Sequence, residues 1–119
     1  MPKIIVKDWI GKEIDQLQNS TIRTAILLLI RDATSDAPIH GYGLSEKLHA
    51  LTYGEIDVSN ATFYAVLRQL KNDGLVEQYE LPNDNRKYYR LTEEGVNGCN
   101  LLLNAWNQYY NYVKLVNDR

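Results

Sequence analysis

The segment from Ser59 to Gly95 most constrains what this 119-residue chain can fold into. Ser59 stands before an amphipathic stretch and is well placed as an N-cap, because its hydroxyl can accept from the free amides of a first helical turn. Apolar residues then recur at helical spacing and form one face: Phe63, Val66, Leu67 and Leu70. Asp73-Gly74 ends the stretch, since glycine readily adopts the left-handed conformation that closes many helices. The pattern predicts a helix between Ser59 and Gly74.

A hairpin follows this helix without a linker. Residues 75–81 and 86–91 are rich in aromatic and aliphatic side chains and are predicted as strands, and Pro82 to Asn85 is a strong turn signal between them. Thr92 then caps a long final helix that reaches about Asn117. A helix followed at once by a basic-tipped hairpin is typical of a winged helix-turn-helix, which places the helix in the major groove of double-stranded DNA and the wing on its phosphates.

Two further helices are expected upstream. Apolar residues recur at helical period from Ile22 to Ala33, and the pattern extends back as far as Lys12. Thr34 to Pro38 is a loop by its turn chemistry, and a second helix is expected over residues 42–52. The predicted class is α+β, mainly α, with an N-terminal extension over residues 1–11, a winged helix-turn-helix domain over 12–91 and a C-terminal dimerisation helix over 92–119.

The charge pattern permits DNA binding without demanding it. The net charge is −2, whereas DNA-binding proteins usually carry a basic footprint. Residues 83–90 contain Arg86, Lys87 and Arg90 against Asp84 alone, so we expect a locally positive hairpin tip. So few phosphate contacts predict a modest, salt-sensitive affinity that a dimer would raise.

Other classes of protein are disfavoured. A single cysteine excludes an internal disulfide and fits a reducing cytoplasm. The longest apolar run, residues 25–30, is too short to span a bilayer, and no signal peptide is recognisable, so we expect a cytoplasmic protein without membrane contact. His40, His49 and Cys99 are too few and too scattered for a metal site, and His40 is expected to organise the start of the second helix. No catalytic constellation or phosphate-cradling loop is recognisable, which predicts a protein that is neither an enzyme nor dependent on a cofactor.

Five motifs, in this order and spacing, resemble the PadR family of winged-helix transcriptional regulators over about residues 20–116. They are His40-Gly-Tyr-Gly43, Ser59-x-x-Thr62-Phe-Tyr64, Leu67-x-x-Leu70, Asp73-Gly-Leu-Val76 and Arg86-Lys-Tyr-Tyr-Arg-Leu-Thr-Glu-x-Gly95. The short final helix with one central tryptophan resembles the compact branch that includes multidrug-responsive repressors. The resemblance implies a homodimer built through the first and last helices, binding to inverted repeats in promoters, and loss of DNA on binding an aromatic or drug-like ligand. The wing turn lacks the glycine-rich tip common in the family, and the first eleven residues, with Trp9, have no counterpart.

The candidate DNA-contacting residues come from three elements. They are Tyr42, Ser59, Asn60, Thr62, Tyr64, Arg68, Lys71, Arg86 and Lys87. A charged helix face is usually just solvated, but the helix start before it and the hairpin after it favour the DNA-facing interpretation here. Ser59 and Thr62 could satisfy backbone amides as well as reach a phosphate or base edge, and Tyr42 is equally a core residue or a phosphate contact.

Three expectations concern the wing itself. Arg86 and Lys87 are interpreted as phosphate contacts in preference to structural ion-pair partners. Tyr88 and Tyr89 point to opposite faces of a strand, so one of them is expected in the core. The alternative function, from a different class, is a winged-helix module that uses the same face for protein partners without binding DNA.

The final helix carries apolar and aromatic residues on more faces than one small monomer can cover, which predicts a homodimer. Trp106 is either a dimer-core residue with no other duty or, with its symmetry mate, a wall of a flat slot for planar aromatic guests; the family resemblance favours the slot. The residues expected around it are Ala25, Cys99, Leu102, Leu103, Trp106 and Tyr110.

Overall fold

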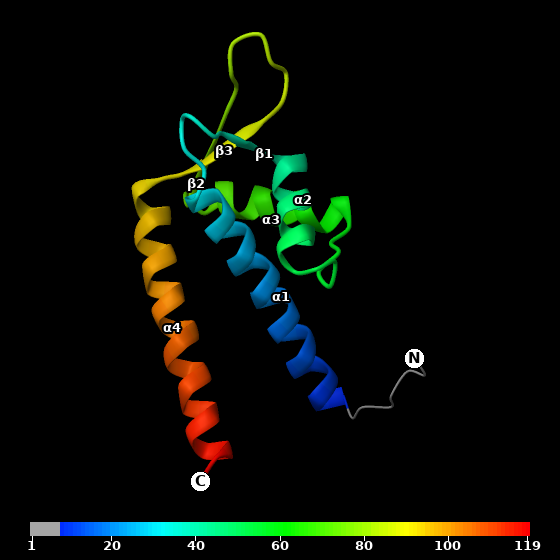
Figure 1. Ribbon diagram of the computed structural model, residues 1–119, viewed down its shortest axis with the longest axis vertical. Coiled ribbons are helices and arrows are strands. Elements are labelled where there is room, and N and C mark those ends of the chain that lie inside the picture. Colours follow the sequence, from blue (N-terminus) through cyan, green and yellow to red (C-terminus); the bar gives the residue numbers. More distant parts are fainter. Residues whose placement is uncertain (1–7) are drawn as a thin grey trace.

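The computed structural model describes residues 8–119 and contains four helices and three short strands (Figure 1). In chain order the elements are α1 (Asp8–Arg31), β1 (Ile39–His40), α2 (Gly41–Leu51), α3 (Asn60–Asn72), β2 (Val76–Tyr79), β3 (Tyr88–Leu91) and α4 (Glu93–Asn117). Three helices, a hairpin and a final helix, in this order, confirm the predicted α+β, mainly α fold with a wing. The lengths of α2, α3 and α4 agree with the sequence pattern to within about one residue at each end.

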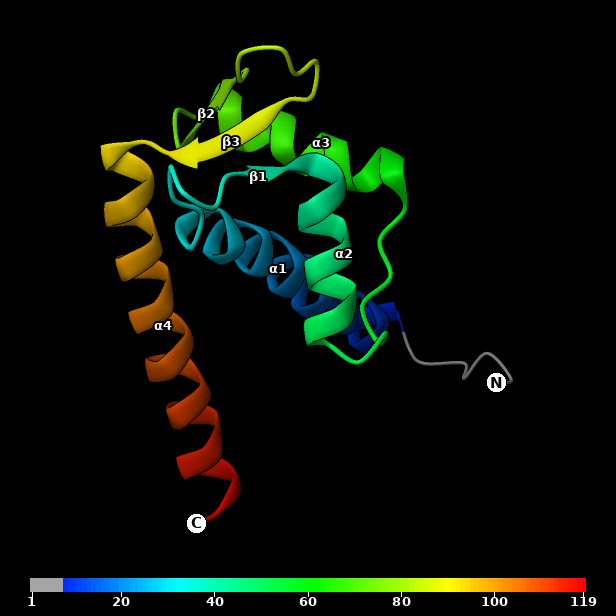
Figure 2. The same ribbon diagram turned by 45° about the horizontal axis from the view of Figure 1, so that its top comes forward.

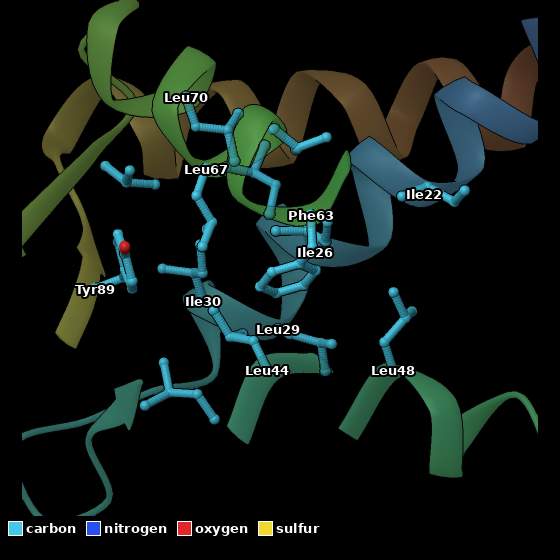
Figure 3. Packing of buried hydrophobic residues seen from close by; sticks show 14 of the residues in the cluster. Ile22, Ile26, Leu29, Ile30, Leu44, Leu48, Phe63, Leu67, Leu70 and Tyr89 are labelled. Atoms are coloured by element: carbon cyan, nitrogen blue, oxygen red, sulfur yellow. The ribbon is translucent and has the colours of Figure 1, made fainter. Parts of the chain in front are cut away.

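The core lies where α1, α2 and α3 converge. Figure 3 shows side chains of the C-terminal half of α1, among them Ile26 and Ile30, lying between Leu44 of α2 and Leu67 of α3, with the Phe63 ring beside them. These five side chains are almost fully buried. Their burial fixes the angle of α3 on the rest of the domain, because a close-packed core tolerates little displacement of its side chains.

The sheet has the order β1-β3-β2 and is antiparallel throughout. Tyr89 of β3 pairs with Ile39 on one side and Gln78 on the other, so β3 is the central strand. The two strands of the hairpin are shorter than predicted, because their ends beyond Tyr79 and before Tyr88 diverge toward the turn. Strand β1 was not predicted: two residues carry no period-two pattern, and only pairing with β3 makes them a strand.

Both Tyr88 and Tyr89 are buried, at 3% and 4% exposure, so the expectation that one of them lies in the core is incomplete. Tyr89 packs into the helical core, as expected for one of the two tyrosines. Tyr88 lies on the opposite face and is covered edge-on by the His40 ring, 5.7 Å away, and by the tilted Tyr79 ring at 5.9 Å. The second burial therefore depends on β1 and β2 lying on either side of β3.

The two long helices lie against each other near the hairpin and diverge toward their outer ends (Figures 1 and 2). Helix α1 begins at Asp8, earlier than the expected Lys12, so residues 8–11 belong to it; residues 1–7 of the expected extension lie outside the described residues. Large apolar side chains remain exposed on both outer halves: Trp9, Ile10, Ile14 and Leu17 of α1, and Tyr109, Tyr110, Val113, Leu115 and Val116 of α4. Neither helix has the sustained apolar stretch that crossing a membrane requires, and no other described helix does.

Candidate nucleic-acid interface

The start of α3 is organised by a local hydrogen-bond network. Ser59 has extended backbone angles and its Oγ accepts from the backbone N–H of Thr62 at 3.2 Å, which confirms the predicted N-cap. The same hydroxyl donates to Thr62 Oγ1 at 3.0 Å. Both side chains therefore have a structural role, and both remain exposed together with Asn60. This leaves their second predicted role, at a phosphate or base edge, sterically open.

The exposed face of α3 carries Tyr64, Arg68 and Lys71, as the helical spacing predicts. With Leu67, Gln78 and Tyr89 these residues line a groove of about 340 Å³ between α3 and the sheet. Arg68 and Lys71 are the cations beside this groove. An exposed helix face with two cations and a phenol, bordered by a hairpin, is the arrangement that a winged helix presents to DNA.

The N-terminus of α2 is held tightly against Tyr64. Gly41 is buried, and a Cβ built on it would lie 2.8 Å from the Tyr64 hydroxyl oxygen and 2.9 Å from its Cε1. A larger residue at position 41 would therefore displace the end of the Tyr64 side chain. His40 caps this helix, as expected, through Nδ1, which accepts from the Gly43 N–H at 3.1 Å. Tyr42 is 66% exposed, so it is not a core residue and the phosphate-contact alternative stands as a prediction.

Asp84 organises the wing turn. Its carboxylate accepts from Arg86 Nε at 3.1 Å, from Arg86 Nη2 at 2.8 Å, from the Arg86 backbone N–H at 2.9 Å and from the Tyr88 hydroxyl at 2.6 Å. The hydrogen bonds from the Arg86 side chain hold the pKa of Asp84 far below its ordinary range, and the Tyr88 hydroxyl adds to this. The cluster closes a turn that contains Asn83, whose φ is 61°.

The contact between Arg86 and His40 is not a simple hydrogen bond. Arg86 Nη1 lies 3.2 Å from His40 Nε2, while His40 Nδ1 is already an acceptor in the α2 cap. A neutral imidazole has one acceptor nitrogen, so Nε2 carries the proton when Nδ1 accepts. Two N–H groups then face each other, and that Nη1 group of Arg86 gains no acceptor from His40. The side chain of Arg86 is 59% exposed, so its outward N–H groups can reach a phosphate while Asp84 holds the inner edge.

Each basic residue of the wing forms an ion pair within the hairpin. Arg86 pairs with Asp84 at 2.8 Å, Lys87 Nζ with Glu80 at 2.8 Å, and Arg90 Nε with Glu77 at 2.9 Å. The structure thus corrects the expectation of a locally positive tip and gives Arg86 and Lys87 ion-pair partners, while both side chains stay exposed and their phosphate contacts stay a prediction. Residues 83–90 taken alone are basic, whereas strand pairing brings Glu77 and Glu80 from the other strand beside them.

Glu77 and Glu80 are the residues that sequence reasoning missed. A signal was available: Glu77 and Glu80 stand as far before the turn as Arg90 and Lys87 stand after it. In an antiparallel hairpin such positions lie opposite each other, and opposite charges at them form cross-strand pairs. The burial of Tyr88 and the Asp84 cluster could not have been found this way, because they depend on the path of the turn.

The residues expected around Trp106 lie where α4 meets α1, with two exceptions. The indole Nε1 of Trp106 donates to Oγ1 of the buried Thr24 at 3.0 Å, and Cys99 is buried with its Sγ 3.9 Å from the Leu27 carbonyl oxygen. Ala25 and Leu103 are partly buried. Leu102 and Tyr110 are exposed. Trp106 therefore has a structural contact in its own chain, and its predicted role in a ligand slot between two chains stays a prediction.

Among residues 8–119 no three His, Cys, Asp or Glu side chains are grouped closely enough to hold a metal ion. The wing cations are paired with carboxylates, and on the exposed face of α3 the fold brings together the Tyr64 hydroxyl and the cations Arg68 and Lys71. These groups suit an anionic, extended partner.

Comparison with known proteins identifies the family. The model of the transcriptional regulator PadR-like family matches residues 26–99, from the buried half of α1 to the first turns of α4. The chain belongs to this family. The match confirms the resemblance inferred from the motifs and places this PadR-like protein among transcriptional regulators rather than enzymes.

Solved structures agree with the family assignment. A PadR family transcriptional regulator from Eggerthella lenta is 25% identical, with a TM-score of 0.70 over 92% of each chain. A PadR-like transcription factor from Bacteroides fragilis is 26% identical, with a TM-score of 0.68 over 88% of this chain and 98% of that one. A transcriptional regulator from Clostridium thermocellum shares the fold, with a TM-score of 0.71, 21% identity and coverage of 83% and 95%.

A curated relative, an uncharacterized protein from Lysinibacillus sphaericus, is 28% identical over 79 residues, which are 64% of this chain and 72% of the relative.

Proposed function

We propose that this PadR-like regulator is a homodimeric repressor that binds an inverted-repeat operator and is released from it by a planar aromatic or drug-like ligand. The observation that carries the proposal is the exposed face of α3, with Tyr64, Arg68 and Lys71, beside a wing that presents Arg86 and Lys87. Acting at promoters, such a protein would work in the cytoplasm.

The exposed apolar surfaces of α1 and α4 support the dimer. They lie on the outer halves of the two helices, where the helices of one chain diverge and cannot cover each other (Figure 1). Contiguous apolar patches on a small protein indicate a partner surface. A two-fold dimer would place the two copies of α3 about 34 Å apart, one turn of DNA. Sedimentation velocity should give a dimer at micromolar concentration, and a stable monomer would contradict the proposal.

The helix and the wing are expected to differ in what they recognise. Double-stranded DNA selected from a random pool by the wild-type protein serves as the specific probe, and a scrambled duplex as the non-specific one. Arg86→Ala and Lys87→Ala should weaken binding to both probes equally and flatten its salt dependence, because phosphate contacts carry no sequence information. Arg68→Ala and Tyr64→Phe should change the ratio of the affinity for the specific duplex to the affinity for the scrambled duplex.

Two outcomes would contradict this assignment. If the wing variants changed the ratio and the helix variants did not, the roles would be reversed. If the wild-type protein bound no duplex even at low salt, the face would serve a protein partner instead.

The ligand part of the proposal concerns Trp106. In a symmetric dimer the two indoles would approach near the two-fold axis, and stacking on each could contribute on the order of 1 kcal/mol beyond area burial. A guest releases DNA only if it favours a dimer in which the recognition helices are misplaced, since equal affinity for both states shifts nothing.

Planar aromatic or cationic compounds should therefore quench Trp106 fluorescence in a Trp9→Phe background and lower operator affinity. Trp106→Ala should abolish the release while leaving operator binding largely intact. Because the indole also bonds Thr24, thermal unfolding must show that the variant is folded. Unchanged release by the same compound in the folded variant would return Trp106 to a packing role.

A further inference from the structure

Two of the ion pairs join the two strands of the hairpin, Lys87–Glu80 and Arg90–Glu77, and they lie on opposite faces of it. Strand register pairs Gln78 with Tyr89 and Glu77 with Arg90, and successive side chains of a strand alternate between faces. Gln78 and Tyr89 line the groove beside α3. Glu77 and Arg90 therefore lie on the face turned away from that groove.

The surroundings of the two cations agree with this alternation. Lys87 lines a hollow with Tyr42 of α2, Tyr64 of α3 and Arg86, all candidate DNA-contacting residues. Arg90 instead lines a separate hollow with residues 33–35 of the loop after α1, and its guanidinium carbon lies 4.4 Å from the centre of the Tyr79 ring. Of these two pairs, the Lys87–Glu80 pair borders the surface offered to DNA.

The Lys87–Glu80 pair is positioned to be exchanged. The two side chains are 52% and 60% exposed and joined by one contact of 2.8 Å, and the nearby carboxylate raises the pKa of Lys87. An exposed pair of this kind is weak, because water screens it and both side chains lose rotamer freedom. A DNA phosphate offers Lys87 the same kind of anionic oxygen. Binding it would cost the bond to Glu80 and leave that carboxylate near the DNA.

We propose that Glu80 competes with DNA phosphate for Lys87 and so lowers the affinity of this protein for duplex DNA of any sequence. The inference rests on the proposed DNA-binding function and adds a residue that limits it. Asp84 has a different role, because its carboxylate also holds the Arg86 backbone and the Tyr88 hydroxyl and thereby the shape of the turn.

The test compares Glu80→Gln with Glu77→Gln, a matched control that removes the same charge from the other face of the same hairpin. The probe is a fluorescein-labelled duplex of scrambled sequence, titrated by anisotropy over a series of KCl concentrations. Glu80→Gln should tighten binding by about two- to five-fold, the range expected for release of an exposed pair. It should also steepen the plot of log affinity against log salt by up to about 0.9, the contribution of one phosphate contact. Glu77→Gln should change both quantities much less.

A double-mutant cycle ties the effect to Lys87. In a Lys87→Ala background, which should itself weaken binding, Glu80→Gln should bring no further gain beyond that of Glu77→Gln. Equal gains from the two glutamine variants, or a gain that persists without Lys87, would overturn the inference in favour of a general charge effect. An unchanged affinity in Glu80→Gln, with Lys87→Ala still weakening binding, would overturn the inference alone. A wild-type protein that binds no duplex at low salt would refute the proposed function and this inference together.

Discussion

Replacing Gly95 by alanine should destabilise the protein, whereas the same replacement at Gly98, in the next turn of α4, should stabilise it. A Cβ on Gly95 would overlap the carbonyl oxygen of Leu75 and lie 3.0 Å from the carbon of that carbonyl. It would also lie 3.2 Å from Leu91 Cδ2. A Cβ on Gly98 would meet Leu75 Cδ2 at 3.7 Å, an ordinary van der Waals distance.

The loss of unfolding free energy in Gly95→Ala depends on which atoms must move to make room for the new Cβ. The obstacle at Gly95 is backbone, so the start of α4 would have to shift away from the hairpin. That shift would strain the bond from the Thr92 N–H to the Leu75 carbonyl, 3.1 Å, and the bond from Thr92 Oγ1 to the Gly74 carbonyl, 2.6 Å. Two such bonds contribute about 2 kcal/mol together. Overpacking adds about 1–3 kcal/mol, and alanine returns up to about 1 kcal/mol of helix propensity.

The expected net effect is a loss of about 2–4 kcal/mol for Gly95→Ala and a gain of about 0.5–1 kcal/mol for Gly98→Ala. Urea unfolding followed by circular dichroism measures both, at one fixed protein concentration because association shifts apparent stability. If Gly95→Ala were as stable as the wild type, the close approach of α4 to the Leu75 carbonyl would not constrain the fold. If both variants lost stability equally, a general intolerance of α4 to side chains would explain the result instead.

Two further predictions concern the caps and the wing. The pKa of Asp84 is depressed in the folded protein. The ionised carboxylate therefore stabilises the fold above the ordinary carboxyl pKa of about 4, and this stabilisation is lost as the pH falls below that value. Asp84→Asn should accordingly reduce the loss of unfolding free energy between about pH 4 and pH 2. A pH dependence equal to that of the wild type would show that the Asp84 cluster does not form in solution. Ser59→Ala removes the N-cap of α3 and should cost about 1 kcal/mol in urea unfolding, whereas Ser59→Asn should restore most of it. Equal losses in both variants would mean that the hydroxyl acts through Thr62 rather than through the helix amide.

The sequence alone was sufficient wherever the determinants are local. Ser59 and Thr92 begin α3 and α4 as predicted, and Gly74 ends α3 with a φ of 75°. Each of these boundaries depends on a side chain and backbone atoms within three or four residues, so adjacent residues contain the information. The exposed face of α3 follows from the same logic, because a helix with one apolar stripe must turn the other side to solvent.

The tertiary structure decided the features that join distant residues. Strand β1 exists because β3 lies beside it, and Tyr88 is buried because His40 and Tyr79 cover it from two other strands. The largest difference between expectation and structure concerns the electrostatics of the wing. The sequence shows Lys87 and Arg90 as cations, and the fold places a carboxylate beside each of them. Composition records which charges a segment contains. Their effect on a partner depends on the atoms within a few ångströms, because Coulomb interactions weaken with distance and solvent screening, and those neighbours are set by strand register and the path of the turn.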